Sequence, residues 1–174
     1  HCAACCSITD VVVVEAVGAE VELFQPGDEV YYAGDVTRPG CNAQYHLVDE
    51  RLAGPKPTTL DFAEAAALPL TTITAWELLF ERMPYDFDAE DNARSLLVIA
   101  GAGGVGSIAI QLARHAGFTV IASASRPQTR DWCLRMGAHH VVDHRQPLAP
   151  QLQALGFDSV DAAVNLADTD RYWD

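Results

Sequence analysis

The chain has 174 residues, of which 49% are hydrophobic and 20% are charged. These values are typical of a globular protein with one large domain or parts of two, and they exclude bulk disorder. A formal net charge of −13 makes the surface repel phosphate backbones and anionic lipids, so nucleic-acid and membrane partners are not expected. The apolar runs are shorter than a bilayer span and the start lacks a signal-peptide pattern, so we expect a cytoplasmic protein.

The five cysteines do not predict a disulfide framework, because their number is odd and their spacing irregular. Three of them lie in the first six residues, HCAACC, where His1, Cys2 and Cys5 admit a zinc-cluster interpretation. A second Cys or His pair does not follow at finger spacing, so we expect no metal site there. The chain begins with His rather than Met, which suggests that sequence is missing upstream.

Up to about residue 50 the pattern is typical of antiparallel strands and turns. VVVVEAVG (11–18) is a β-branched run closed by glycine, and FQPGDEVYYA (24–33) has a Pro-Gly turn before a strand. AQYHLVD (43–49) alternates apolar and polar residues, which predicts a further strand.

Helical signals follow. Asp61 and Glu64 have capping-box spacing before an alanine-rich helical turn, which we expect Pro69 to end. The next segment, TTITAWELLFERM, has an apolar helical stripe of Ile73, Trp76, Leu79 and Phe80.

The acidic connection at 84–92 has Asp86, Asp88 and Glu90 at calcium-loop spacing. It lacks the glycine and the final glutamate of such a loop, so a solvated loop is favoured.

From Leu96 onward strands and helices alternate, which predicts a parallel sheet with right-handed crossovers. The expected strands are 96–100, 119–124, 140–143 and 161–166, and the expected helices are 104–116, 127–136 and 148–155. The predicted fold class is therefore α/β, with a partial β domain over 1–60 and the first half of a doubly wound domain over 61–174. This second domain is truncated after its fourth strand, and residues 1–10 are atypical.

A glycine motif lies between the strand run LLVIA and the helix that follows it. Gly101 is expected to permit the tight turn, Gly103 the approach of a pyrophosphate, and Gly106 the close packing of helix on strand. The helix start offers N–H groups and partial positive charge to phosphates. The predicted cofactor-binding residues are therefore Gly101, Ala102, Gly103, Gly104, Val105 and Gly106. The alternative is a glycine-rich turn without a ligand.

The second strand bears on which nucleotide binds. Ser125 falls nineteen residues after Gly106, where an NAD-selective site carries Asp or Glu. A hydroxyl followed by Arg126, with Arg130 one turn on, would accept a 2′-phosphate instead, so NADP(H) is the predicted cofactor. The alternative is that Arg126 is a surface arginine at a helix start. Leu166 and Ala167, at the end of the fourth strand, are expected to approach the cofactor.

With these motifs the chain resembles the medium-chain dehydrogenase/reductase superfamily, in its quinone-oxidoreductase and zinc-type alcohol-dehydrogenase-like branch. The resemblance covers residues 11–174 and is carried by VVEAVGAEVELFQPGDEVYYAG, AEAAALPLTTITAWELL, GAGGVGSIAIQLARHAGFTVIASASR and MGAHHVVDH. It implies a GroES-like catalytic domain joined to a Rossmann domain. It also implies hydride transfer from NADPH to a quinone, enone or related carbonyl compound, often in a homodimer. Thr74 would then lie near the nicotinamide; a helix cap or a packing hydroxyl is the alternative.

The departures concern zinc. Zinc-dependent members have Gly-His-Glu before VVEAVG, where this chain has Ser7, Ile8 and Thr9, and their second catalytic cysteine falls at Leu70. Only Cys41 lies where their structural-zinc cysteines would follow GDEV. The comparison therefore implies zinc-independent chemistry, in which hydrogen-bond donors polarise the carbonyl. A whole member has two domains of ordinary size, so a fragment is expected, and a non-catalytic nucleotide-binding remnant is the alternative function.

Other residues are weighed against catalytic or metal roles. The neighbours His139 and His140 point to opposite faces of a strand, so a metal triad with His144 is not expected. Tyr45 and His46 are possible proton donors, although strand packing is favoured for both. Cys133 is expected to be a small buried residue. No catalytic residue is named, since bound water serves equally as a proton source.

Overall fold

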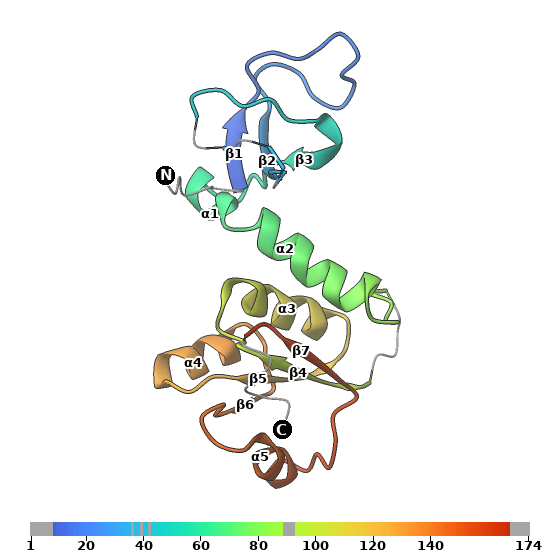
Figure 1. Ribbon diagram of the computed structural model, residues 1–174, viewed down its shortest axis with the longest axis vertical. Helices are drawn as coiled ribbons and strands as arrows, with labels where there is room; N and C mark the ends of the chain where they lie inside the picture. Colours follow the sequence, from blue (N-terminus) through green and yellow to red (C-terminus); the bar gives the residue numbers. More distant parts are fainter. Residues whose placement is uncertain (1–8, 36, 39, 42, 89–92, 168–174) are drawn as a thin grey trace. The chain divides into compact units, whose positions relative to one another are not determined.

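The computed structural model describes residues 9–35, 37–38, 40–41, 43–88 and 93–167. The chain divides into two compact units, residues 1–70 and 71–174, and Figure 1 shows the elements of each. The division falls inside helix α2 (Pro69–Trp76), whereas the sequence placed the domain boundary near residue 60.

The described part of unit 1 contains a small antiparallel sheet of strand order β1-β2-β3. Its strands are β1 (Thr9–Val13), β2 (Glu29–Ala33) and β3 (Ala53–Pro55), and a short 3₁₀ turn, η1 (Glu50–Leu52), precedes the last of them. Val12 lies opposite Val30, which in turn lies opposite Pro55. The antiparallel character predicted for this part is confirmed.

Two strand predictions in unit 1 are wrong in extent or place. The first strand ends at Val13. Val14 still exchanges backbone hydrogen bonds with Gly27 and Asp28, but the segment opposite it turns away at Gly27, whose φ is +97°. The segment 43–49 forms no strand, although it alternates; Leu47 in it is 81% exposed. An alternating sequence needs a partner strand, and both edges of β2 are already paired, one with β1 and the other with β3.

The capping box before the first helix is confirmed. Helix α1 (Phe62–Ala66) begins after Asp61, whose carboxylate accepts from the Glu64 N–H at 2.8 Å. The Glu64 carboxylate accepts from the Asp61 N–H at 3.1 Å. Pro69 does not end this helix but begins α2, where its missing N–H costs nothing because the first turn has no intrahelical acceptor.

The helical prediction for 71–83 is confirmed, but the buried face differs from the expected stripe. Helix α2 continues as a π-helical segment, η2 (Glu77–Glu81). Ala75 and Leu79 are fully buried, while Ile73 and Trp76 are 47% and 38% exposed. The inward face therefore follows Ala75 and Leu79, and the half-buried Phe80 packs against the same core.

The described part of unit 2 holds a parallel sheet of strand order β6-β5-β4-β7. Its strands are β4 (Ser95–Ile99), β5 (Thr119–Ser123), β6 (His140–Val142) and β7 (Ala162–Asn165). The helices between them are α3 (Gly104–His115), α4 (Pro127–Arg135) and α5 (Leu148–Ala154). The expected strands and helices are thus all present, to within about one residue. The order reverses between β4 and β7, which makes that gap the topological switch point of the sheet.

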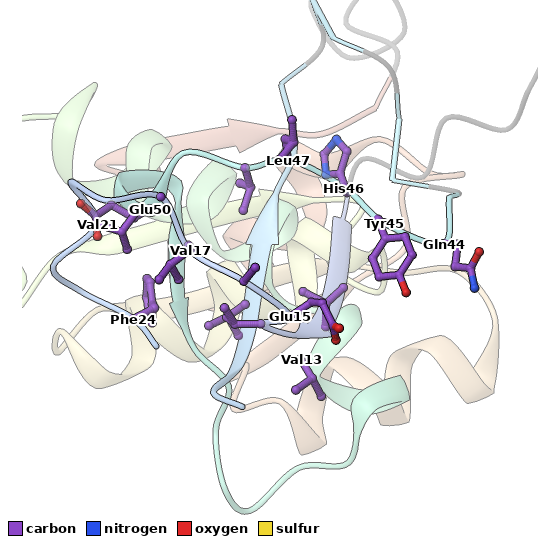
Figure 2. A pocket seen from close by; sticks show the side chains of 17 residues that line it. Val13, Glu15, Val17, Val21, Phe24, Gln44, Tyr45, His46, Leu47 and Glu50 are labelled. Atoms are coloured by element: carbon purple, nitrogen blue, oxygen red, sulfur yellow. The ribbon is translucent and has the colours of Figure 1, made fainter. Parts of the chain in front are cut away.

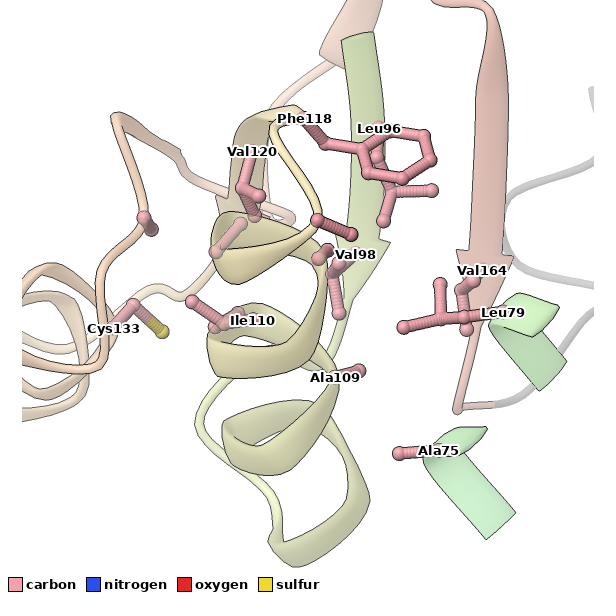
Figure 3. Packing of buried hydrophobic residues seen from close by; sticks show 14 of the residues in the cluster. Ala75, Leu79, Leu96, Val98, Ala109, Ile110, Phe118, Val120, Cys133 and Val164 are labelled. Atoms are coloured by element: carbon pink, nitrogen blue, oxygen red, sulfur yellow. The ribbon is translucent and has the colours of Figure 1, made fainter. Parts of the chain in front are cut away.

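Strand β4 is buried on both faces, and Figure 3 shows the packing on one of them. Leu96 and Val98 face the cluster that contains Ile110 of α3 and Cys133 of α4. Leu97 and Ile99 face the other cluster, against residues of α5. Because both faces are covered, the strand has a continuous apolar run instead of an alternating one. The end of β4 is therefore held firmly in the sheet, and the glycine motif starts there.

Among the described residues, no helix is long and apolar enough to span a membrane.

Candidate nucleotide-binding site

The turn after β4 is tight and begins with a residue in an unusual conformation. Ala100 has φ of +60°, in the left-handed region, and its carbonyl accepts from the Gly103 N–H at 3.0 Å. Gly103 is the N-cap of α3, with φ −75° and ψ 172°. A left-handed conformation costs an L-residue about 1–2 kcal/mol. The residue that carries the left-handed conformation is Ala100, whereas Gly101, beside it in the turn, does not have a positive φ.

The glycines of the motif have different steric roles. A Cβ on Gly101 would lie 2.8 Å from the Cβ of Ala122 and 3.2 Å from the Cys133 Sγ, so this glycine lets the turn cross β5 and α4. A Cβ on Gly106 would lie only 2.5 Å from the Ala100 carbonyl oxygen, in keeping with the predicted close packing of α3 on the strand end. A Cβ on Gly103 would lie 3.4 Å from the Ala100 carbonyl oxygen, which is an ordinary van der Waals contact.

The N-terminus of α3 has no side-chain cap. Gly103 has no side chain to cap the helix, and the first turn of α3 carries no acidic residue. The first N–H groups of a helix have no intrahelical acceptor, and the helix dipole gives them partial positive charge. Gly103 and Gly104 are exposed, whereas Gly106 is buried. This arrangement can bind an anion such as a phosphate through backbone N–H groups.

A hydrogen-bonded chain ties α4 to the first turn of α3. The Ser107 hydroxyl donates to the Gly103 carbonyl at 2.7 Å, and the Trp132 indole Nε1–H donates to the Ser107 Oγ at 2.8 Å. The sequence analysis did not single out either residue. Their contact joins two helices, so no local pattern could have revealed it.

The last residue of β5 is hydrogen-bonded to the turn. Ser123, the last residue of β5, accepts from the Ala100 N–H through its Oγ at 3.0 Å. Its backbone carbonyl accepts from the Gly101 N–H at 3.2 Å. This residue was also missed, although a serine inside the apolar run VIASA is a visible signal.

The predicted 2′-phosphate residues follow β5 directly. Ser125 is half-buried, and Arg126 is the exposed N-cap of α4. Arg130 is already engaged, because its guanidinium donates to the carbonyls of Val141 at 2.9 Å and Ala124 at 3.4 Å. Arg145, which was not predicted, donates from Nη2 to the Ser125 carbonyl at 2.9 Å. Ser125 is therefore contacted by an arginine from a distant loop and followed directly in the chain by Arg126.

Arg145 is itself paired with a carboxylate. Its Nη2 lies 2.8 Å from Oδ2 of Asp143, and hydrogen bonds from the Arg145 side chain and backbone lower the pKa of Asp143 to about 2. Both side chains are solvent-accessible, so the pair orients the guanidinium more than it stabilises the fold.

Leu166 lies at the same edge of the sheet as the glycine turn. The pairing of Ile99 with Asn165 brings the carboxyl ends of β4 and β7 together, and Leu166 follows β7. Thr74 lies on α2, where it is half-buried. One turn earlier on the same helix, the methyl group of Thr71 would lie 3.1 Å from a Cβ on Gly104. The structure thus brings the turn, the end of β7 and Thr71 of α2 into one region of unit 2.

Tyr45 and His46 line a cleft within unit 1 (Figure 2). The cleft has a volume of about 340 Å³, and its wall is largely apolar. His46 Nδ1 lies 2.9 Å from the hydroxyl of the buried Tyr32, and burial raises the pKa of that hydroxyl above its usual range. Tyr45 is 70% exposed. The expectation that both residues pack on a strand is therefore wrong, since neither lies in one.

Metal ligands do not gather in the part of the chain that the structure describes. No group of three His, Cys, Asp or Glu side chains there could hold a metal ion. His139 is engaged structurally, because its Nδ1 accepts from the Val120 N–H at 3.0 Å. Cys133 is fully buried, as predicted. Outside the described residues lie His1, Cys2, Cys5, Ser7, Ile8 and Glu90 of the interpretations above.

A parallel sheet that reverses its strand order beside a glycine turn and a helix N-terminus defines a Rossmann-type domain. Residues 104–173 match the family model of the zinc-binding dehydrogenases. A zinc-type alcohol dehydrogenase-like protein of Staphylococcus aureus is 45% identical over 161 residues, which cover 92% of this chain and 48% of that protein. The predicted resemblance to the medium-chain dehydrogenase/reductase superfamily is thereby confirmed. The chain spans about half the length of the curated relatives it matches.

Two solved structures and one further curated relative give the same result. A protein of Rhizobium etli CFN 42, a zinc-dependent alcohol dehydrogenase by its given name, is 53% identical with a TM-score of 0.86, over 94% of this chain and 48% of that one. The Escherichia coli quinone oxidoreductase complexed with NADPH is 29% identical with a TM-score of 0.72, over 85% and 44%. An NADPH-dependent alkenal/one oxidoreductase of Arabidopsis thaliana is 35% identical, over 90% of this chain and 40% of that protein. The α/β fold with GroES-like and Rossmann parts is therefore confirmed.

Proposed function

We propose that this chain is part of an NADPH-dependent oxidoreductase that transfers hydride to a quinone, enone or related carbonyl compound. The observation that carries the proposal is the glycine turn, where Gly103 and Gly104 are exposed and α3 begins without a side-chain cap beside the switch point of the sheet. The similarity to an NADPH-bound quinone oxidoreductase and to an NADPH-dependent alkenal/one oxidoreductase supports the cofactor and the substrate class.

In this proposal different residues of the chain bind different parts of the nucleotide. Residues 101–106 hold the pyrophosphate through backbone N–H groups at the start of α3. The Ser125 hydroxyl and the Arg126 guanidinium receive the 2′-phosphate, since a guanidinium can bond a phosphate with two N–H groups at once. Leu166 and Thr74 approach the nicotinamide end. NADPH supplies the hydride, so a protein nucleophile is not required.

The proposal includes zinc-independent chemistry. Leu70 stands where zinc-dependent members have a cysteine, and Cys41 is buried beside the Tyr32 hydroxyl. Hydrogen-bond donors then polarise the substrate carbonyl, and water supplies the proton. The homodimer implied by the resemblance and a cytoplasmic location belong to the same proposal for the longer protein.

Two titrations test the proposal. Purified protein is titrated with NADPH and with NADH while nicotinamide fluorescence is followed, and a quinone is then added while nicotinamide absorbance is followed. Tight binding of NADPH with decay on addition of quinone is the expected result. Binding without decay would support the second candidate function, a nucleotide-binding fragment without turnover. Binding of neither nucleotide would overturn both.

The 2′-phosphate assignment has its own test in Arg126→Ala. Loss of a charge-assisted hydrogen bond is worth about 1.5–3 kcal/mol, so NADPH should bind about tenfold or more weakly. NADH, which lacks the phosphate, should bind as before. Arg82→Ala is the matched control. Arg82 is an exposed arginine that directly follows η2, and it belongs neither to the glycine turn nor to the segment after β5. Equal losses of NADPH and NADH affinity would contradict the assignment.

A further inference from the structure

Two consecutive N–H groups at the end of β4 are both bonded to Ser123 of β5. The Ala100 N–H donates to the Ser123 Oγ at 3.0 Å, and the Gly101 N–H donates to the Ser123 backbone carbonyl at 3.2 Å. Ser123 is 1% exposed, so neither bond competes with bulk water. In a parallel ladder these two groups would point in opposite directions across the strand. Here both point to one residue, so the strand ends and the turn begins at that residue.

The bond to the hydroxyl acts on the strained position of the turn. Ala100 has φ of +60°, and no side chain of its own favours that conformation. Its N–H is held by the Ser123 hydroxyl, and its carbonyl is held by the Gly103 N–H at 3.0 Å. Without the hydrogen bond to the Ser123 hydroxyl, the peptide plane between Ile99 and Ala100 loses the contact that fixes its orientation. The position of its carbonyl, and of the Gly103 N–H bonded to it, then becomes less defined.

That carbonyl also sets where α3 starts. It lies 2.5 Å from the position of a Cβ on Gly106, so strand end and helix start are in direct contact. A small movement of Ala100 therefore moves the exposed backbone from Gly103 to Val105, which is the part of the turn that faces solvent. Electrostatic binding of a phosphate by N–H groups is effective when those groups are fixed in advance.

We propose that Ser123 is a positioning residue for the nucleotide pyrophosphate: its buried hydroxyl holds Ala100 left-handed and thereby fixes the phosphate-facing N–H groups of residues 103–105. The proposal rests on the proposed function, because it concerns the same nucleotide. Ser123 touches no part of the ligand itself; it acts through the backbone of the turn.

The test separates two ligands that share the 2′-phosphate but differ at the turn. NADPH carries the pyrophosphate, whereas 2′-AMP has the 2′-phosphate and adenosine alone. Binding of each to the full chain is measured by titration calorimetry. For Ser123→Ala, loss of one buried hydrogen bond should weaken NADPH about tenfold. The affinity for 2′-AMP should change by less than about twofold, because that ligand does not reach the turn.

Ser95→Ala is the matched control. Ser95 is also a buried serine of this sheet, at the opposite end of β4, where its hydroxyl donates to Asp161 Oδ2 at 2.8 Å. This variant makes the same chemical change far from the turn, so it should lower the melting temperature without changing the affinity for either ligand. Ser123→Thr keeps the Oγ acceptor, and its NADPH affinity should stay within about threefold of the wild type.

The outcomes are distinguishable. Unchanged NADPH affinity in Ser123→Ala, equal weakening of both ligands, or a threonine variant as weak as the alanine variant would each overturn the proposal. Failure of Ser123→Ala to fold would also overturn it, because the hydroxyl would then support the sheet as a whole. Failure of the wild-type chain to bind both ligands would instead remove the proposed function.

Discussion

The contact between α3 and the end of β4 leaves no room for a side chain at Gly106. A Cβ there would lie 2.5 Å from the Ala100 carbonyl oxygen and 2.9 Å from the Cα and carbonyl carbon of Gly101. All three atoms belong to the backbone, so no rotamer change can relieve the overlap. Gly106→Ala must therefore move α3 away from the strand, which loosens the packing of Ala109 and Ile110, both fully buried.

Overpacking of a core position costs about 1–3 kcal/mol, and contact with rigid backbone places this substitution near the upper value. For a domain of the size of unit 2, a loss of about 3 kcal/mol in the free energy of unfolding lowers the melting temperature by roughly 10 °C or more. Thermal unfolding followed by circular dichroism measures the difference.

Gly103→Ala is the matched control for this experiment. The added Cβ would lie 3.4 Å from its nearest neighbour, and φ at that position is −75°, which alanine adopts freely. Its stability should change by less than about 1 kcal/mol, because the lost N-cap preference and the reduced chain entropy oppose each other. A Gly106→Ala variant as stable as the wild type, or equal losses in both variants, would refute the steric argument.

Two further predictions concern helix capping and pH. Asp61→Ala removes the acceptor of the Glu64 N–H and should lower stability by about 1 kcal/mol in urea unfolding, whereas Glu64→Gln retains a capping-box acceptor and should cost less; an alanine variant with an unchanged midpoint would contradict this. Arg145→Ala should raise the pKa of Asp143 from about 2, although the backbone N–H of residue 145 still donates to the carboxylate. Because the folded-state pKa is depressed, the stabilisation is present above the unfolded pKa of about 4 and is lost as pH falls toward 2, so the variant should show a weaker acid dependence. Carboxyl chemical shifts across that range measure the change, and an unchanged midpoint for Asp143 would be the contrary result.

Unit 2 was predicted nearly completely because its central strands, β4 and β5, are buried on both faces. The run SLLVI of β4 has no polar residue after its first position, and the Gly-rich turn marks the start of α3. Such runs form strands in almost any context that buries them, so periodicity and punctuation suffice. In unit 1 the same reasoning misplaced a strand at 43–49, because whether an alternating segment forms a strand depends on a partner distant in sequence.

The candidate site divides in the same way. The motif and the residues after β5 were found from spacing alone, since glycines and a serine-arginine pair are local signals. Ala100, Arg145 and the Trp132–Ser107 contact were missed, because an alanine in a left-handed turn looks like any other alanine in sequence.

By itself, the sequence determined the order of strands and helices in unit 2, the place of the glycine turn and the capping box at Asp61. These depend on residues within a few positions of one another, so local sterics and burial decide them. Only the tertiary structure decided that Ala100 carries the left-handed turn, that Gly101 is required by β5 and α4, and that Ser123 holds the strand end. Each of these depends on atoms that folding brings together from separate elements. The distances between such atoms cannot be read from the order of residues in the sequence.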